Sequence, residues 1–319
     1  MAEFSEGELE QHRVGLTGFC YRMLGGAGEA EDAVQETMLK AWKAAEDYDP
    51  GRAALSTWLY RIATNVCIDL TRGARRRAVA MDFGPAATGP EIGPALPGRW
   101  VEPMPDARIL PDDPAELAAQ RESVRLAFVA ALQQLPPRQR AVLILREVLA
   151  WPAAEVATLL DTTVASVNSA LQRARAAIRR PVPAAPLDDE HRALLDRYVT
   201  AFERFDVDTL TALLHQDATM SMPPFAWWLQ GRAAIRFVLE RSDGGCHGAR
   251  LLPTGANGSP AFGQYRPNGD VFRPFALVVL ELSGGLIVNT ITFLDAVDDF
   301  PRFGLPAELR ADEFPVRPS

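Results

Sequence analysis

Hydrophobic residues recur at helical spacing through the first 180 positions of the chain. Five segments place apolar side chains on one side and polar side chains on the other, which is typical of amphipathic helices. They cover residues 9–23, 30–45, 55–71, 117–134 and 138–149. Gly25-Gly26 follows the first segment, and the turn Tyr48-Asp49-Pro50-Gly51 separates the second from the third. This part of the chain is therefore predicted to be all-α.

Residues 151–180 predict a helix-turn-helix. Two short helical patterns flank the polar break Asp161-Thr162-Thr163, where a threonine can cap the second helix. Asp161 stands where such a turn usually has a glycine. The outward face of the second helix carries groups that bind base edges and phosphates: Ser166, Asn168, Ser169, Gln172, Arg173 and Arg175. A plain helical hairpin with a hydrated face is the alternative interpretation.

The hydrophobic pattern changes after residue 190. Helical spacing at residues 191–205, 208–214 and 231–239 is interrupted by one alternating segment and followed by four more, which predict strands. The strands are expected at residues 218–222, 251–256, 259–266, 275–282 and 286–294, with Gly284-Gly285 closing a hairpin. Helices followed by an antiparallel sheet indicate an α+β domain.

Composition adds the domain boundaries. Proline and glycine crowd residues 78–115, which predicts a semi-extended linker between residues 1–77 and 116–180, and a shorter linker at 181–189 precedes residues 190–319. The longer linker is more apolar than a spacer requires, so part of it is expected to dock on a folded domain. Its large apolar residues are Trp100, Val101, Met104, Ile109 and Leu110.

Charge and cysteine content exclude several classes. The net charge of −8 is not that of a nonspecific polycation, but cations cluster at residues 72–77 and 173–180, where they can attract a phosphate backbone. The 3 cysteines form no CxxC pair, which argues against a disulfide framework or a structural zinc site and fits a reducing cytosol. No signal peptide and no membrane span are expected.

Three long motifs resemble the conserved regions of extracytoplasmic-function (ECF) sigma factors. They are DAVQETMLKAW, STWLYRIATNVCIDLTRGARRR and LPPRQRAVLILREVLAWPAAEVATLL, in the order that the family has them. The resemblance implies a bacterial, cytoplasmic, non-enzymatic subunit that binds core RNA polymerase through the β′ clamp helices and the β flap. It also implies promoter DNA as a partner, with strand separation at the −10 element.

The resemblance assigns roles to matching positions. Polymerase binding falls to Asp32, Gln35, Glu36 and Trp42, and −10 binding to Asn65, Asp69, Arg72, Arg75, Arg76 and Arg77. The helix-turn-helix would read the −35 element. Asn168 and Ala170 stand where the family usually has a lysine and an arginine, so a weaker phosphate contribution is expected. Trp58, Leu59 and Ile62 are interpreted as core.

The C-terminal part resembles the SnoaL-like branch of the NTF2-like cone fold, through HQDATMSMPP, LQGRAAIRFVL and the final hairpin. A candidate pocket for an unidentified small ligand would be lined by Tyr198, Phe202, Met220, Met222, Trp227, Trp228 and Phe293, although core packing is the favoured interpretation of the tryptophans. His215 and Asp217 are expected in a surface loop rather than as a catalytic pair. No cofactor or metal is expected, and the resemblance implies regulation in cis.

Two other functions are open at this point. A ligand-sensing helix-turn-helix regulator would use the DNA-reading helix and the pocket but would leave DAVQETMLKAW without a role. A SnoaL-like enzyme fused to a DNA-binding module would leave more of the chain unexplained. Transcription with core polymerase separates these alternatives, because only a sigma factor starts RNA at a defined site.

Overall fold

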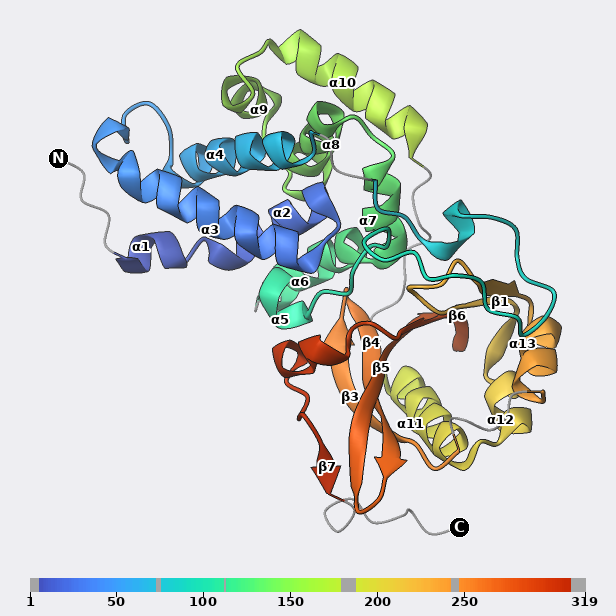
Figure 1. The fold of residues 1–319 in the computed structure, drawn as a ribbon. Coiled ribbons are helices and arrows are strands. Elements are labelled where there is room, and N and C mark those ends of the chain that lie inside the picture. The colour runs from blue at the N-terminus through green and yellow to red at the C-terminus, as the bar shows by residue number, and fades with distance from the viewer. Residues whose placement is uncertain (1–5, 73–75, 112, 179–187, 242–246, 311–319) are drawn as a thin grey trace. The chain divides into compact units, whose positions relative to one another are not determined.

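The computed structural model describes residues 6–72, 76–111, 113–178, 188–241 and 247–310. The chain divides into two compact units (Figure 1). The helical unit comprises residues 1–79 and 98–182, and the C-terminal unit comprises residues 80–97 and 183–319. Residues 80–97 of the predicted linker therefore group with the C-terminal unit, and residues 78–79 and 98–115 group with the helical unit.

The first part of the helical unit is a bundle of α2 (Arg13–Leu24), α3 (Ala27–Lys43) and α4 (Leu55–Leu70), with α1 (Glu6–Glu10) before it and the 3-10 turn η1 (Ala45–Asp47) between α3 and α4. The three longer helices pack on one another. Gly25 ends α2 in the left-handed conformation, with φ 75°, and its amide donates to the carbonyl of Tyr21. The helix end expected from Gly25-Gly26 is thus confirmed.

The second part contains α5 (Asp106–Ile109), α6 (Pro114–Arg121), η3 (Glu122–Val124), α7 (Leu126–Gln133), α8 (Pro137–Leu143), the π turn η4 (Ile144–Val148), α9 (Ala153–Leu159) and α10 (Val164–Ala177). The single helix expected over residues 117–134 is wrong. It is interrupted at Arg125, which has an extended backbone with ψ 142°. The interruption turns Ser123 toward α2, where it accepts hydrogen bonds from Arg22.

The returning half of the linker docks on the first bundle. All five apolar residues expected to dock are buried: Trp100, Val101, Met104, Ile109 and Leu110. The amide of Glu102 donates to the carbonyl of Gly25 at 3.0 Å, and the Tyr21 hydroxyl donates to the carbonyl of Glu102 at 2.7 Å. The expectation that part of this segment docks is therefore confirmed.

The C-terminal unit is a single sheet with helices on one face. Its strands are β1 (Leu214–Ser221), β2 (Trp228–Gln230), β3 (Arg250–Ala256), β4 (Ser259–Asn268), β5 (Val271–Ser283), β6 (Leu286–Phe293) and β7 (Leu309–Arg310). They are ordered β2-β1-β6-β5-β4-β3, with β7 on β5. Only β1 and β6 pair in parallel among these strands. Gly284 and Gly285, with φ 57° and 71°, form the tight turn predicted between β5 and β6.

Helices α11 (Asp189–Arg204), α12 (Val207–Ala212) and α13 (Arg232–Leu239) contribute side chains to one hydrophobic core with the inward-facing residues of the sheet. The 3-10 turn η5 (Val297–Phe303) lies on the opposite face, where Phe300 and Leu305 leave no room for a side chain at Gly263. The α+β prediction is confirmed, and β2, β7 and η5 are additions to it. His215 and Asp217 lie in β1 rather than in a loop, with side chains 42% and 72% exposed.

Candidate nucleic-acid interface

The helix-turn-helix forms as the pattern predicts. Thr163 caps α10, because its hydroxyl oxygen accepts from the amide of Ser166 at 3.1 Å. Asp161 occupies the turn with φ 50°, a left-handed conformation that aspartate tolerates better than most residues. Val167, Leu171 and Ala174 are buried and fix which face of α10 points outward.

All six predicted −35 residues are exposed on α10: Ser166, Asn168, Ser169, Gln172, Arg173 and Arg175. Their side chains differ in whether they form hydrogen bonds or ion pairs within the protein. The Ser166 hydroxyl is hydrogen-bonded to Thr163 at 3.0 Å. The guanidinium of Arg175 is paired with the carboxylate of Glu147. A hydrogen bond of 3.1 Å joins Arg175 Nε and Glu147 Oε1. Arg173 forms no ion pair among the described residues, so it is the more available cation.

Two of the predicted −10 residues, Asn65 and Asp69, lie on the last turns of α4, and Arg72 follows the end of the helix. Asn65, Asp69 and Arg72 are exposed, and a 3.0 Å ion pair joins Asp69 to Arg72. Arg76 is also exposed. Arg75 lies outside the described residues. Of the three positions interpreted as core, Leu59 is fully buried, whereas Trp58 and Ile62 are half-buried.

Arg77 differs from the other cations of this run, because it is only 8% exposed. Its guanidinium pairs with Glu102 at 2.6 Å and with Glu29 at 3.1 Å, and donates to the carbonyl of Trp100 at 2.9 Å. Burial alone would lower the pKa of Arg77, but the charges of Glu102 and Glu29 outweigh it and raise the pKa. Arg77 thus connects the docked linker to α3 through ion pairs. A side chain buried in these pairs does not fit the DNA contact that was expected for it.

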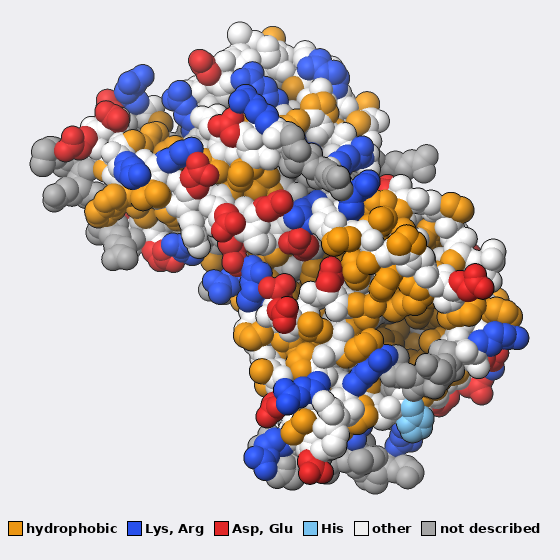
Figure 2. Space-filling view, viewed as in Figure 1, with side chains coloured by type: hydrophobic (Ala, Val, Ile, Leu, Met, Phe, Trp, Pro, Cys, Tyr) orange, Lys and Arg blue, Asp and Glu red, His pale blue; other side chains and the backbone are white. Residues whose placement is uncertain are grey.

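The predicted polymerase-binding residues lie on the exposed side of α3. Asp32, Gln35 and Glu36 are exposed, and Trp42 has 58% of its surface open to solvent. Leu39, one turn before Lys43, is 52% exposed. Figure 2 shows hydrophobic side chains at the surface over this helix. Large exposed apolar side chains beside carboxylates are typical of a protein-binding surface.

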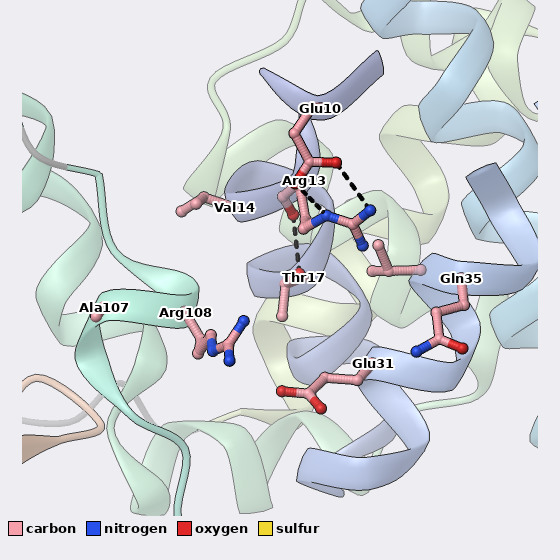
Figure 3. A pocket seen from close by; sticks show the side chains of 9 residues that line it. Glu10, Arg13, Val14, Thr17, Glu31, Gln35, Ala107 and Arg108 are labelled. Atoms are coloured by element: carbon pink, nitrogen blue, oxygen red, sulfur yellow. Dashed lines mark hydrogen bonds and ion pairs between the residues drawn. The ribbon is translucent and has the colours of Figure 1, made fainter. Parts of the chain in front are cut away.

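A pocket of about 330 Å³ opens beside this surface. It lies between α2, α3 and α5, and Figure 3 shows Arg13 on α2, Arg108 on α5, and Glu31 and Gln35 on α3 around it. Arg13 is held by Glu10 at 2.5 Å. The pocket presents charges of both signs, and its lining includes Gln35, a predicted polymerase-binding residue.

Within the helical unit, the α2–α4 bundle packs directly against α7, α8 and α9. Arg22 of α2, which is 1% exposed, donates to Ser123 Oγ at 2.7 Å. Arg140 of α8 donates to the carbonyl of Met23 and to Gln133 Oε1. The acceptors are carbonyl, amide and hydroxyl oxygens, and among the described residues neither arginine pairs with a carboxylate. Burial therefore lowers the pKa of each arginine to about 10.

The predicted pocket of the C-terminal unit is mainly core. Five of its residues, Tyr198, Phe202, Met220, Met222 and Trp227, belong to or pack against the main hydrophobic cluster. Trp228 and Phe293 are buried, at 9% and 3% exposure, but are not members of that cluster. Figure 2 shows a hollow bordered by hydrophobic side chains on this unit. Neither tryptophan is purely packing, because both indole N–H groups donate to backbone carbonyls of the linker.

The described residues contain no group of three or more His, Cys, Asp or Glu side chains arranged to hold a metal ion. His215 and Asp217 are separated by 4.0 Å between Nδ1 and Oδ2, and the ring nitrogen instead accepts from the amide of Asp217. Across the described part of the chain, no helix has the length and apolarity to cross a membrane.

An exposed helix-turn-helix, a second helical region that carries exposed cations, and an α+β cone define a multidomain DNA-binding protein of the sigma-70 type. Family models agree with this division: Sigma-70 region 2 matches residues 9–77, Sigma-70 region 4 matches 125–178, and the nuclear transport factor 2 (NTF2) domain matches 190–251. The ECF RNA polymerase sigma factor SigG of Mycobacterium tuberculosis is 44% identical over 313 residues, which cover 94% of this chain and 83% of SigG. The chain belongs to the ECF family of RNA polymerase sigma factors.

A second relative shares the whole architecture. SigJ of Mycobacterium tuberculosis is 28% identical over 287 residues, covering 86% of this chain and 85% of SigJ. The crystal structure of SigJ superposes with a TM-score of 0.62 at 25% identity, over 95% of this chain and 100% of that one. The family and the fold class predicted from the sequence are therefore confirmed. Below, the α2–α4 bundle is called region 2, and residues 122–178 are called region 4.

Proposed function

We propose that this chain directs core RNA polymerase to specific promoters, with α3 as its polymerase-binding surface, α4 and Arg76 as the −10 reader and α10 as the −35 reader. The observation that carries the proposal is the exposed polar face of α10 on a correctly capped helix-turn-helix, in a relative of SigG. The β′ clamp helices are the expected partner of α3, and the β flap that of region 4. The proposed place of action is the cytoplasm, and the proposed role is regulatory rather than enzymatic.

The helical unit favours a closed resting arrangement that must open on the promoter. It contains about 160 residues, for which a radius of gyration of about 15 Å and a span of about 40 Å are expected. The −35 and −10 elements lie about 25 base pairs apart, or about 85 Å along the duplex. Region 2 and region 4, packed on each other, cannot reach both elements. Polymerase binding would have to supply the free energy that separates them.

Run-off transcription with purified core polymerase tests the proposal. The full-length chain should start RNA at a defined site on a cognate promoter, and core polymerase alone should not. A double charge reversal, Asp32→Lys with Glu36→Lys, should weaken polymerase capture while leaving the far-UV spectrum unchanged, because both side chains are exposed. Glu36 gives up only a surface pair with Lys40, worth about 0.3–0.5 kcal/mol. Unaffected capture would show that α3 is the wrong surface.

The C-terminal unit is proposed to regulate initiation in cis. Its support is the covalent fusion of an NTF2-type domain to both sigma regions, in a chain whose matches to SigG and SigJ extend over 94% and 86% of its length. Truncation after Pro183 should change transcription from the cognate promoter several-fold. The comparison needs full-length and truncated protein, both shown to be folded, at saturating and at limiting core polymerase. Equal output under both conditions would leave the domain without this role.

A further inference from the structure

Residues 80–97, here called the arm, form a loop whose two ends are held together. The amide of Ala78 donates to the carbonyl of Arg99 at 2.9 Å, and the amide of Val101 donates to the carbonyl of Ala78 at 3.1 Å. The arm therefore leaves the helical unit and returns to it at one place. Between these points it belongs to the compact C-terminal unit, together with the C-terminal domain.

Four hydrogen bonds fix the arm to one short segment of the C-terminal domain, residues 223–228. The indole N–H of Trp227 donates to the carbonyl of Gly89 at 3.1 Å, and that of Trp228 to the carbonyl of Gly84 at 3.0 Å. In the opposite direction, the amide of Ala87 donates to the carbonyl of Trp228 at 2.7 Å. The amide of Leu96 likewise donates to the carbonyl of Pro224 at 2.8 Å.

Packing and strand pairing add to these bonds. The side chain of Ala87 packs against the hydrophobic cluster of the C-terminal domain. Ala95 pairs with Phe225 as an isolated antiparallel bridge. Contacts are thus distributed from Gly84 to Leu96, along most of the arm.

The chemistry of the arm matches this mode of binding. Its sequence AMDFGPAATGPEIGPALP is rich in glycine and proline, so after the 3-10 turn η2 (Ala80–Asp82) it forms turns and irregular backbone rather than a longer helix or a strand. Aromatic side chains with an N–H donor are the usual recognition elements for such segments. Most arm side chains are exposed, so the recognition is of backbone groups and of the turns that glycine permits.

We propose that residues 223–228 form a peptide-binding surface of the C-terminal domain, and that its ligand is the Gly/Pro-rich arm of the same chain. The arm is part of the linker between region 2 and region 4. Binding of the arm therefore connects the C-terminal domain non-covalently to the sigma linker, in addition to the covalent connection after residue 182. That consequence rests on the regulation in cis proposed above, whereas the contact itself does not.

An engineered disulfide tests the contact in the full-length chain. Opposed residues of an antiparallel pair have Cα atoms about 4.5–5.5 Å apart, within the range that a disulfide spans. Ala95→Cys with Phe225→Cys, in a Cys246→Ser background, should form an intramolecular disulfide with oxidised glutathione. Peptide mass spectrometry and non-reducing electrophoresis detect it. The control pair Ile92→Cys with Phe225→Cys, from an exposed arm position, should form it at least tenfold more slowly.

Hydrogen exchange provides a second measurement that leaves residues 223–228 unaltered. Leu96→Pro removes the amide that donates to Pro224 and should raise exchange in arm peptides about tenfold, as expected for a lost hydrogen bond of roughly 1.4 kcal/mol. Ile92→Pro places the same change at an amide that forms no hydrogen bond among the described residues. This control should leave the exchange rate of the arm peptides unchanged. Equal cross-linking of both cysteine pairs, or unprotected arm amides in the parent chain, would overturn the proposal.

Transcription by the cross-linked and the reduced protein then separates the contact from its consequence. If the arm must leave the C-terminal domain during initiation, the disulfide should lower promoter output several-fold, and reduction should restore it. A disulfide that forms readily and leaves output unchanged would keep the peptide-binding surface and would refute regulation through the arm.

Discussion

Ser123→Ala should open the contact between region 2 and region 4. Ser123 Oγ accepts two hydrogen bonds from the Arg22 guanidinium, at 3.1 Å from Nε and 2.7 Å from the terminal nitrogen. Among the described residues, Arg22 then keeps the carbonyl of residue 123 at 3.2 Å and Gln120 Oε1 at 3.4 Å as acceptors. In an open state water solvates this guanidinium, so the substitution destabilises mainly the closed state.

The expected magnitude follows from the charge on Arg22. Hydrogen bonds to charged groups contribute about 1.5–3 kcal/mol, more than neutral ones, because an unsatisfied buried charge is costly. Loss of the Ser123 hydroxyl should therefore raise the ratio of open to closed molecules by roughly 10- to 150-fold. The removed atom is a single oxygen, so only a small packing defect accompanies it.

Double electron–electron resonance between spin labels on region 2 and region 4 measures this ratio. Lys43→Cys at the end of α3 and Ala176→Cys near the end of α10 are both exposed sites. A Cys246→Ser background leaves only the buried Cys20 and Cys67 as other thiols. Ser123→Ala should add a population at longer distance, which core polymerase should also induce in the parent chain. Ser283→Ala, at an exposed position of the C-terminal unit, should not.

Identical distance distributions in the parent chain and Ser123→Ala, with both proteins folded, would refute the opening argument. So would a distribution in the polymerase complex that keeps the closed distance. Either result would mean that the helical unit reads promoter DNA without separating its two regions.

Four further predictions follow from single side chains. Arg173→Ala should weaken promoter binding by holoenzyme by about 1–3 kcal/mol and leave core capture intact; unchanged footprints would remove it from the reading face. Asp161→Val should destabilise the helical unit by about 1–2 kcal/mol in denaturant titrations, because a β-branched residue resists φ 50°, and Asp161→Gly should not. Trp227→Phe and Trp228→Phe should each destabilise the C-terminal unit by about 1 kcal/mol; full tolerance would mean simple core packing. Hydrogen bonds from the third residue of α12 lower the pKa of Asp206, so in thermal melts the stability advantage over Asp206→Ala should be complete above about pH 4 and be lost as the pH falls from there through the lowered pKa of the folded state.

Elements that are determined by local periodicity and capping were predictable from the sequence. Thr163 caps α10 because its hydroxyl reaches an amide three residues on, and Gly284-Gly285 turns the chain within two residues. The continuous helix across residues 117–134 was not correct, because a contact distant in sequence decides it. Ser123 bonds to Arg22, 101 residues earlier, and the helix breaks two residues after it, at Arg125.

The same limit applies to the candidate sites. Arg77 follows directly after Arg76 in one cationic run, and no local pattern separates them. What distinguishes Arg77 is its pairing with Glu29 and Glu102, which are 48 and 25 residues away. The arm was predicted as a linker because its glycines and prolines carry no hydrophobic period. Its binding relies on backbone carbonyls and amides, which every sequence has. The adjacent Trp227-Trp228 pair was the one sequence signal for that site.

The contact between region 2 and region 4 includes an aromatic pair, Tyr60 with Trp151, whose ring centroids are 5.1 Å apart, but its polar part suits a surface that must open. Arg22 and Arg140 are buried with neutral acceptors only, and Nε of Arg140 has no partner among the described residues. Burying unpaired cations costs free energy that an apolar contact of similar area would not, so the net stability of the closed state is reduced. Moving a population from 99% closed to 99% open requires about 5.5 kcal/mol of differential binding. A surface of ordinary size on core polymerase can supply that amount, whereas a fully apolar interface between the two regions would demand much more.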